Sequence, residues 1–165
     1  MPNEIDETAR ISPLADIESS VRGNVVRIGA NSMVDSFVKI KFAGGAANVI
    51  IGTNCYINSG VTIYSGNGVT LGNDVLIAAN CTLAASNHET GSRSLPIRSQ
   101  GHGVSRGGIL IEDDVWIGAN CVILDGAKIG RGAVIGAGSL VRGEVPAYAK
   151  AVGNPLRIVG SRTGL

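Results

Sequence analysis

Two histidines are the residues of this chain best suited to moving a proton. Both, His88 and His102, lie in residues 84–110, a stretch that interrupts an otherwise regular pattern. A neutral imidazole near pH 7 can accept a proton from a hydroxyl group and so act as a general base. A histidine in a loop is more often simply solvated, so residue type alone leaves both interpretations open. Glu89 either orients His88 or is solvated, and His102, between two glycines, is expected on the loop surface.

A six-residue repeat predicts the elements that must position these side chains. An aliphatic residue recurs at every sixth position in three blocks, which are offset by insertions near 43–50, 64–70 and 84–110. The aliphatic positions are Ile28, Val34, Ile40, Ile51, Ile57, Ile63, Leu71, Ile77, Leu83, Ile111, Ile117, Ile123, Ile129, Ile135 and Val141. Each repeat predicts one short strand and one corner, so three repeats predict a triangular coil of about eighteen residues.

The positions between the aliphatic residues predict how the corners turn. The third residue after the aliphatic is Asn, Asp or Gly in most repeats, and Phe37 is a misfit. These residue types tolerate the positive φ that a sharp corner needs. The fourth residue is small, and we expect it inside the prism beside the aliphatic side chain. Stacked coils would then pair their strands in parallel at a spacing of ~4.8 Å.

Length, composition and charge agree with one all-β domain. The chain has 165 residues, 24 of them Gly, and only 4% are aromatic, which suits short strands joined by tight corners. The expected divisions are a polar N-terminal segment (1–20), the β-helix (21–144) with its loop (84–110), and a tail packing on the last coil (145–165). A net charge of +1 gives no reason to expect a nucleic-acid partner.

The termini and the cysteines bear on the cellular setting. The N-terminus is acidic and polar, unlike a signal peptide, and we find no apolar run long enough to span a membrane. Three cysteines are an odd number and do not suggest a disulfide framework, so we expect a reducing, cytoplasmic setting. Cys55, Cys81 and Cys121 occupy the inward small position of the repeat, which favours packing over covalent catalysis.

Several apolar residues are expected on the outside of the prism. Trp116, the single tryptophan, directly follows the inward Val115, so alternation along the strand points it outward. Residues eighteen positions apart should stack, which predicts the rows 116/134 and 122/140. Outward apolar rows favour a partner surface, although single exposed apolar residues are common.

The repeats and five segments resemble the left-handed β-helix acyltransferases of the hexapeptide-repeat superfamily, most closely the bacterial sugar O-acetyltransferases of lipopolysaccharide and capsule synthesis. The segments are residues 86–89, 96–101, 111–120, 136–139 and 152–155. The left hand of the helix is taken from this resemblance, because the usual crossover rule favours the opposite hand. The resemblance implies transfer of an acetyl group from acetyl-CoA, without a metal, to a hydroxyl of a sugar or glycan precursor.

The same resemblance implies roles for individual residues. His88 matches the position of the family's catalytic base, and Asn58 matches an acceptor-binding asparagine. The expected CoA-binding residues are Trp116, Ala119, Ala137, Arg142 and Arg157, the two arginines being placed to meet the CoA phosphates. In this family the apolar surfaces pack a homotrimer whose active sites lie between subunits.

Some other functions fit parts of the same pattern. A nucleotide-linked amino-sugar N-acetyltransferase, or a xenobiotic acetyltransferase, shares every feature above and stays open. A β-helix carbonic anhydrase needs three histidine ligands for its metal, and two histidines in one loop argue against it. A non-enzymatic solenoid of the ice-binding kind would present outward threonine arrays, which we do not find; the long loop and Trp116 favour an enzyme.

Overall fold

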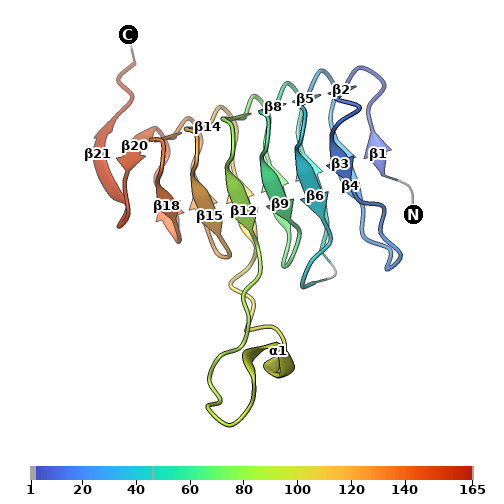
Figure 1. The fold of residues 1–165 in the computed structure, drawn as a ribbon. Helices are drawn as coiled ribbons and strands as arrows, with labels where there is room; N and C mark the ends of the chain where they lie inside the picture. Colours follow the sequence, from blue (N-terminus) through green and yellow to red (C-terminus); the bar gives the residue numbers. More distant parts are fainter. Residues whose placement is uncertain (1–2, 46, 165) are drawn as a thin grey trace.

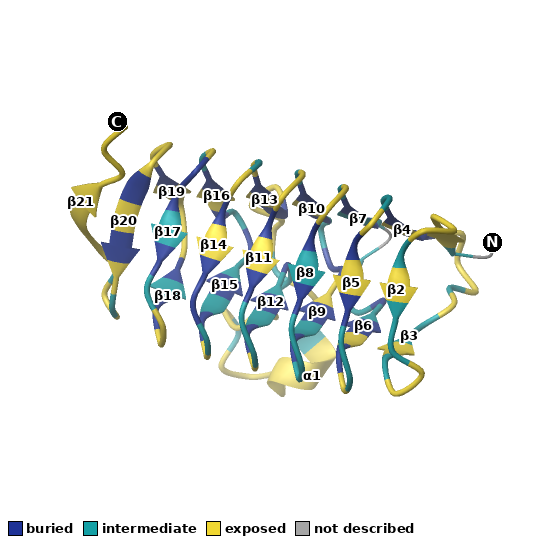
Figure 2. Cartoon of the chain, turned by 90° about the horizontal axis from the view of Figure 1, so that it is seen from above, coloured by how far each residue is buried: buried dark blue, intermediate teal, exposed yellow. Residues whose placement is uncertain are grey.

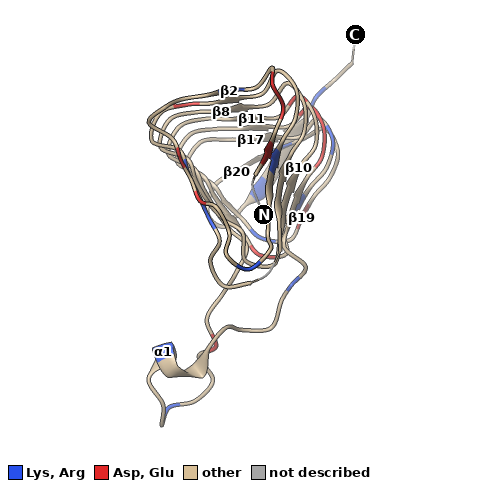
Figure 3. Cartoon of the chain, turned by 90° about the vertical axis from the view of Figure 1, so that its right-hand side faces the viewer, with Lys and Arg blue, Asp and Glu red and all other residues tan. Residues whose placement is uncertain are grey.

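The computed structural model describes residues 3–45 and 47–164, which wind into a parallel β-helix with a triangular cross-section (Figures 1 and 3). Each coil gives one short strand to each of three sheets, which we call A, B and C. The single helix within the described residues, α1 (Ile97–Gln100), lies in the long loop. None of the described segments forms a helix with the length and apolar character that crossing a bilayer requires.

The strands of each sheet follow one another along the prism. Sheet A contains β1 (Glu4–Ile5), β4 (Val26–Ile28), β7 (Val49–Ile51), β10 (Val69–Leu71), β13 (Ile109–Ile111), β16 (Lys128–Ile129) and β19 (Glu144–Val145). Sheet B contains β2 (Arg10–Ile11), β5 (Met33–Val34), β8 (Tyr56–Ile57), β11 (Leu76–Ile77), β14 (Trp116–Ile117), β17 (Val134–Ile135), β20 (Ala149–Val152) and β21 (Arg157–Ser161). Sheet C contains β3 (Asp16–Ile17), β6 (Lys39–Lys41), β9 (Thr62–Tyr64), β12 (Thr82–Ala84), β15 (Val122–Leu124) and β18 (Leu140–Val141).

The core is the column of aliphatic side chains that the repeat predicts. Ile57, Ile77 and Ile117 stack in register on successive strands of sheet B, and each is fully buried. The small residues that follow the corners, such as Cys81 and Ala133, also point inward and are 0% exposed. Burial of each large aliphatic side chain contributes roughly 1.5–3 kcal/mol, so the repeated column is the main source of stability.

The corners adopt the backbone conformation that their residue types predict. The φ angles are positive at Asn31, Asn54, Asp74, Asn80, Asp114, Asn120, Gly60, Gly126, Gly132 and Gly138. Phe37, the exception in the pattern, takes the same conformation with φ of 63°. The geometry of the corner therefore overrides the preference of this residue, and its ring is left 62% exposed.

The β-helix begins earlier than the sequence pattern indicated. Instead of forming a separate polar segment, the N-terminal residues contribute β1, β2 and β3, which pair in parallel with β4, β5 and β6. The acidic residues of this first coil meet basic residues of the second, as in the ion pairs Glu4–Arg27 and Asp16–Lys41, both with N···O near 2.5–2.6 Å. At the other end, β19 and β20 continue the coil and β21 returns antiparallel to β20.

The insertions that interrupt the repeat all lie at one corner of the prism, between sheets C and A. Residues 42–48 lie between β6 and β7, residues 65–68 join β9 to β10, and residues 85–108 join β12 to β13. The last of these projects far from the prism and carries α1 (Figures 1 and 3). The three insertions therefore form one edge of the molecule.

Outward apolar residues form rows on sheets B and C. The predicted rows are confirmed: Trp116 is in register with Val134, and Val122 with Leu140. Leu76 belongs to the same row, because it is in register with Trp116. Figure 2 shows exposed residues on β5, β11 and β14 of this sheet. Trp116 is 52% exposed in the single chain.

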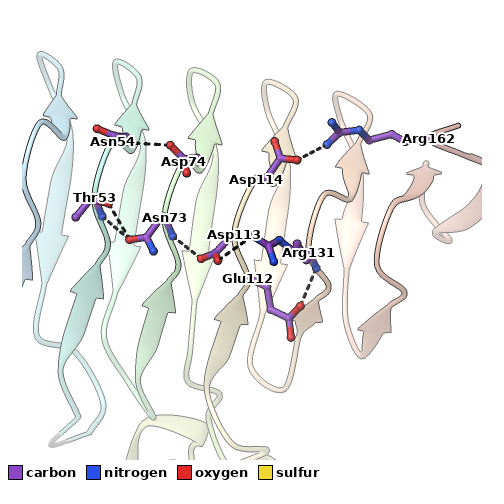
Figure 4. Close-up of polar contacts among 9 residues, drawn as sticks. All are labelled: Thr53, Asn54, Asn73, Asp74, Glu112, Asp113, Asp114, Arg131 and Arg162. Atoms are coloured by element: carbon purple, nitrogen blue, oxygen red, sulfur yellow. Dashed lines mark hydrogen bonds and ion pairs between the residues drawn. The ribbon is translucent and has the colours of Figure 1, made fainter. Parts of the chain in front are cut away.

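A ladder of polar side chains follows the corner between sheets A and B (Figure 4). The amide and hydroxyl of Thr53 donate to Asn73 Oδ1 at 2.9 and 3.0 Å, and the amide of Asn73 donates to Asp113 Oδ1 at 2.7 Å. Arg162 donates to Asp114 Oδ2 at 2.7 Å and so attaches the C-terminal tail to the ladder. The contacts of Asn73 each join one coil to the next, whereas Arg162 reaches past the coil of Gly132 to Asp114.

Candidate functional site

The long loop leaves and rejoins the prism as two paired arms. The amide of Glu89 donates to the carbonyl of Gly101 at 3.1 Å, and the amide of Gly103 donates to the carbonyl of Asn87 at 2.8 Å. These bonds make a short antiparallel bridge between His88 and His102. The part of the loop that carries α1 extends away from the prism (Figure 3).

His88 is held in a defined orientation by the opposite arm. Its Nδ1 atom lies 3.3 Å from the carbonyl oxygen of Gly101. A carbonyl oxygen only accepts hydrogen bonds, so a neutral imidazole in this contact carries its proton on Nδ1 and keeps the lone pair of Nε2 available. The side chain is exposed. The arrangement suits a neutral imidazole that accepts a proton at Nε2.

His102 is exposed, as expected, but it also packs against His88. The two rings are stacked with their centroids 5.3 Å apart and their planes at 28°. On its other side the His102 ring approaches Gly44, where a Cβ atom would lie 3.3 Å from Cε1. Sequence analysis missed this contact, because the pairing of the two arms is not visible in the spacing of the residues.

The carboxylate of Glu89 stabilises its own turn. Its Oε1 atom accepts the amide protons of Thr90 and Gly91, both at 2.8 Å. No hydrogen bond joins Glu89 to His88 in the part of the chain that the structure describes. Gly101, rather than Glu89, therefore orients the imidazole within one chain.

A buried carboxylate grips the base of the loop. Asp125 is 2% exposed, and its oxygen atoms accept from the amides of Arg106 and Gly108 at 2.8 Å each and from Asn67 Nδ2 at 3.0 Å. Sequence analysis did not single out Asp125. The six-residue spacing alone does not mark it, because the equivalent positions of other repeats, such as Thr53 and Arg131, are exposed.

A second group of candidate residues meets at the corner between sheets B and C. Asn58 starts this corner, and its backbone and side-chain N–H groups both donate to the carbonyl of Ile77 at 3.0 Å. Ala119 and Ala137 lie at the same corner two and three coils further on, where the amide of Gly138 donates to the Ala119 carbonyl at 2.8 Å. Trp116 immediately precedes this corner on β14.

Asp35, which sequence analysis did not single out, lies one coil before Asn58. The pairing of Val34 with Ile57 brings the two residues side by side. The amide of Ser36 and the hydroxyl of Ser59 donate to its carboxylate at 2.7 and 2.8 Å. The hydrogen bond from the Ser36 amide, and after it that from the Ser59 hydroxyl, hold the pKa of Asp35 below its usual range. A fixed carboxylate therefore stands beside the predicted acceptor-binding asparagine.

The two predicted arginines lie near the C-terminal end of the prism. Arg142 follows β18 at the far edge of sheet C and lines a groove with Leu140, Asn154, Pro155 and Leu156. Arg157 is on β21, which extends sheet B. Both side chains are exposed.

One chain does not bring all the predicted site residues together. His88 lies at the corner between sheets C and A, whereas Asn58, Ala119 and Ala137 lie at the corner between sheets B and C. The full width of sheet C separates these two groups. Trp116 is beyond the second corner, on the outward face of sheet B.

The three cysteines are buried, free thiols inside the prism. Burial raises the pKa of Cys55. Cys81 and Cys121 lie on successive coils, where their thiols donate to the carbonyls of Gly118 and Gly136 at 3.1 and 3.2 Å, and the neighbouring Cys121 thiol and burial raise the pKa of Cys81. Both sulfur atoms nevertheless lie in a packed interior, where a thiolate has no water to stabilise it and no substrate can approach.

Comparisons with known proteins identify the same repeats. Residues 108–143 match the family model described as bacterial transferase hexapeptide (six repeats), and residues 47–85 match the hexapeptide repeat of succinyl-transferase. The chain is 36% identical to a galactoside O-acetyltransferase of Escherichia coli (strain K12), over 86% of this chain and 66% of the relative. It is 30% identical to the putative acetyltransferase YJL218W of Saccharomyces cerevisiae, over 88% of this chain and 74% of the relative.

A solved structure shares the whole architecture. The crystal structure of AntD, an N-acyltransferase from Bacillus cereus in complex with dTDP and 3-hydroxybutyryl-CoA, matches with a TM-score of 0.79 and 22% identity, over 95% of this chain and 81% of that one. The fold is therefore the left-handed parallel β-helix of hexapeptide repeats. This chain spans between 35% and 66% of the length of four curated relatives that it matches. Together, the repeats, the prism and the relatives show that the chain belongs to the hexapeptide-repeat transferase family.

Proposed function

We propose that the protein transfers an acetyl group from acetyl-CoA to a hydroxyl group of a sugar or glycan precursor. The observation that carries this proposal is the orientation of His88, whose Nδ1 donates to Gly101 while Nε2 is left free to accept a proton. A relative that covers most of this chain is a galactoside O-acetyltransferase, which supports a sugar hydroxyl as the acceptor. The β-helix of AntD holds an acyl-CoA, which supports a CoA thioester as the donor.

In the proposed reaction His88 acts as the general base. Its Nε2 removes the proton from the acceptor hydroxyl as the oxygen attacks the thioester carbonyl carbon. A carbon–oxygen bond forms, the carbon–sulfur bond breaks, and the proton passes from His88 to the departing CoA thiolate. The sugar gains the acetyl group and CoA leaves as the thiol. The buried positions of the three cysteines support this direct transfer over an acyl-cysteine intermediate.

The donor is proposed to lie along sheet C. The small residues Ala119 and Ala137 leave their backbone groups accessible at one edge, and the groove beside Arg142 lies near the C-terminal end. Arg142 and Arg157 are exposed cations suited to the CoA phosphates. Asn58, with Asp35 beside it, is proposed to bind hydroxyl groups of the acceptor.

The active site is proposed to be completed in a homotrimer. His88 and the residues of the other corner are separated by sheet C within one chain, so a second subunit would supply the missing wall. The apolar rows that contain Trp116 and Val122 support such an interface. The three free thiols also support a reducing, cytoplasmic setting.

The proposal is tested by the release of CoA from acetyl-CoA in the presence of candidate acceptors. The panel contains free sugars, nucleotide sugars, lipid-linked glycans and amino sugars, each assayed with the wild-type protein and with His88→Ala. We expect turnover with a hydroxyl acceptor, the product to be an acetyl ester by mass spectrometry, and loss of turnover in the variant. Turnover confined to an amino sugar, with an amide product, would instead establish an N-acetyltransferase.

A further inference from the structure

The base of the long loop is bonded to one buried side chain of the prism, that of Asp125. Asp125 lies on the coil that follows the loop, directly after β15, and it is 2% exposed. One of its oxygen atoms accepts the amide proton of Gly108, and the other accepts from the amide of Arg106 and from Asn67 Nδ2. All three partners are N–H donors, which match an acceptor-only carboxylate.

Asn67 extends this contact to the outgoing arm. Its own amide donates to the carbonyl of Ala85 at 2.8 Å, where the chain leaves sheet C. Asn67 therefore touches the start of the loop through its backbone and Asp125 through its side chain. The pair joins both ends of the loop to two different coils of the prism.

The space around this junction is filled by close backbone contacts. A Cβ atom on Gly66 would lie 2.3 Å from the carbonyl oxygen of Ala85, and one on Gly108 would lie 2.5 Å from that of Gly68. These positions accept only glycine, so backbone packs against backbone at the base of both arms. The amide of Ile109 also donates to the Gly68 carbonyl at 2.8 Å.

The junction connects to His88 through the returning arm. Gly101, His102 and Gly103 precede the residues that Asp125 holds, and they provide the carbonyl that orients His88, the ring that stacks on it, and the amide that pairs with Asn87. A shift of this arm would move all three contacts together. Since a misplacement of about 1 Å costs on the order of 10²-fold in rate, the anchoring matters for catalysis.

We infer that Asp125 is a positioning residue, which fixes His88 by anchoring the returning arm of the loop. This inference rests on the proposed role of His88 as the base. Asp125 does not contact the reacting atoms and acts only through the loop.

The substitution Asp125→Asn tests this inference with little change in volume. It places an amide against three N–H donors, so we expect kcat to fall about tenfold or more while the KM for acetyl-CoA changes by less than about twofold. Asp114→Asn is the matched control, since Asp114 is an exposed acid on the same coil as Asp125 and its ion-pair partner is Arg162. The control should keep wild-type kcat.

Two readouts separate positioning from a general loss of structure. In a His88→Ala background, Asp125→Asn should cause no further loss of turnover, whereas an independent structural defect would multiply the losses. Hydrogen exchange should accelerate at the amides of Glu89 and Gly103 but not at coil amides such as that of Trp116. If Asp125→Asn fails to fold, Asn67→Ala removes one anchor without touching the carboxylate and should accelerate the same two amides.

The outcomes also distinguish this inference from the proposed function. If His88→Ala retains turnover, the base assignment fails, and hydrogen exchange still tests whether Asp125 anchors the arm. Wild-type exchange at Glu89 and Gly103 in Asp125→Asn would overturn the anchoring. An equal loss of kcat in the wild-type and His88→Ala backgrounds would overturn the route through His88.

Discussion

The two ring nitrogens of His88 have different surroundings, and this difference decides what the residue can do. Nδ1 faces the Gly101 carbonyl at 3.3 Å, while the ring itself rests against His102. Backbone and ring contacts fix the direction of the imidazole without a carboxylate partner. Among the described residues, the imidazole is thus oriented by a backbone carbonyl and a ring, with no carboxylate bonded to it.

His88→Ala is expected to lower kcat by about 10²–10⁴, the usual contribution of a general base. Assembly and the KM for acetyl-CoA should stay close to wild type, because the side chain lies outside the coil core. Steady-state CoA release on the identified acceptor measures both parameters. His102→Ala is the companion variant and should show a smaller loss, since it removes a stacking ring but leaves the Gly101 carbonyl in place. Near-normal turnover of His88→Ala would show that the base lies elsewhere.

Replacing all three cysteines by alanine is expected to preserve turnover per folded protein. Cys55, Cys81 and Cys121 are at most 1% exposed, so their loss should weaken packing by about 1 kcal/mol or more per site. Chemical unfolding measures that cost, and CoA release measures activity in the same preparation. A cysteine-linked acetyl adduct that passes its acetyl group to acceptor would contradict direct transfer.

At the residue scale, the resemblance to the hexapeptide-repeat acyltransferases pointed to His88 as the base, which stays a prediction, and the sequence did not indicate its immediate partners. The position of His88 at the start of the only long break in the repeat is visible from spacing alone. The stacking of His102 and the grip of Asp125 depend on how two arms, separated by more than ten residues, pair with each other. No local preference fixes that pairing, and it becomes clear only when the arms and the prism are placed together.

Among the elements, the corners show how the coil constrains single residues. Asn80, Asn120, Gly60 and Gly138 occupy the corner between sheets B and C, as Phe37 does. A non-glycine residue other than Asn or Asp costs about 1–2 kcal/mol in this conformation. Phe37 therefore carries a local strain that its neighbours along the same edge avoid.

Phe37→Asn is expected to raise the free energy of unfolding by about 1 kcal/mol. The gain comes from relief of the positive φ, and little is lost because the ring is 62% exposed. Equilibrium denaturation with urea measures the change. Phe37→Ala is the control: it removes the ring but keeps the unfavourable backbone preference, so it should not stabilise the protein. Equal stability of the Asn and Ala variants would argue against strain at this corner.

The six-residue pattern predicted most strands and the corner conformation, because each repeat carries its own core residue and its own turning residue. It also continues into the first coil, where Ile5, Ile11 and Ile17 are six residues apart. The small residues Ala9 and Ala15 lie four positions after Ile5 and Ile11. The acidic residues of this segment favoured its interpretation as a polar surface segment. One of these acids, Glu4, forms an ion pair with Arg27 of the next coil. The spacing of the repeats did not show that the three insertions share one corner, and this becomes apparent only when the chain is wound into coils.

For the molecule as a whole, we expect a homotrimer in solution. The row of outward apolar residues that includes Leu76 and Trp116 leaves both side chains about half exposed in a single chain. Light scattering should give three times the mass of the chain at micromolar concentration. Trp116→Lys should weaken the assembly, because it places a charge in the apolar row. Leu110→Lys, a matched change on sheet A, should leave the mass unchanged.

A stable monomer at micromolar concentration would contradict this expectation. It would also leave His88 without the opposite wall that the proposed active site needs. Loss of the trimer in Leu110→Lys rather than in Trp116→Lys would place the interface on sheet A.

The reversed direction of β21 has a consequence for growth of the prism. A parallel β-helix whose last coil had open edges would be a template on which another molecule could continue the same winding and build a fibre. Here the final strand of sheet B runs antiparallel to its neighbour, so a further coil would meet a strand of the wrong polarity. The antiparallel strand therefore closes this edge of sheet B to continued parallel winding.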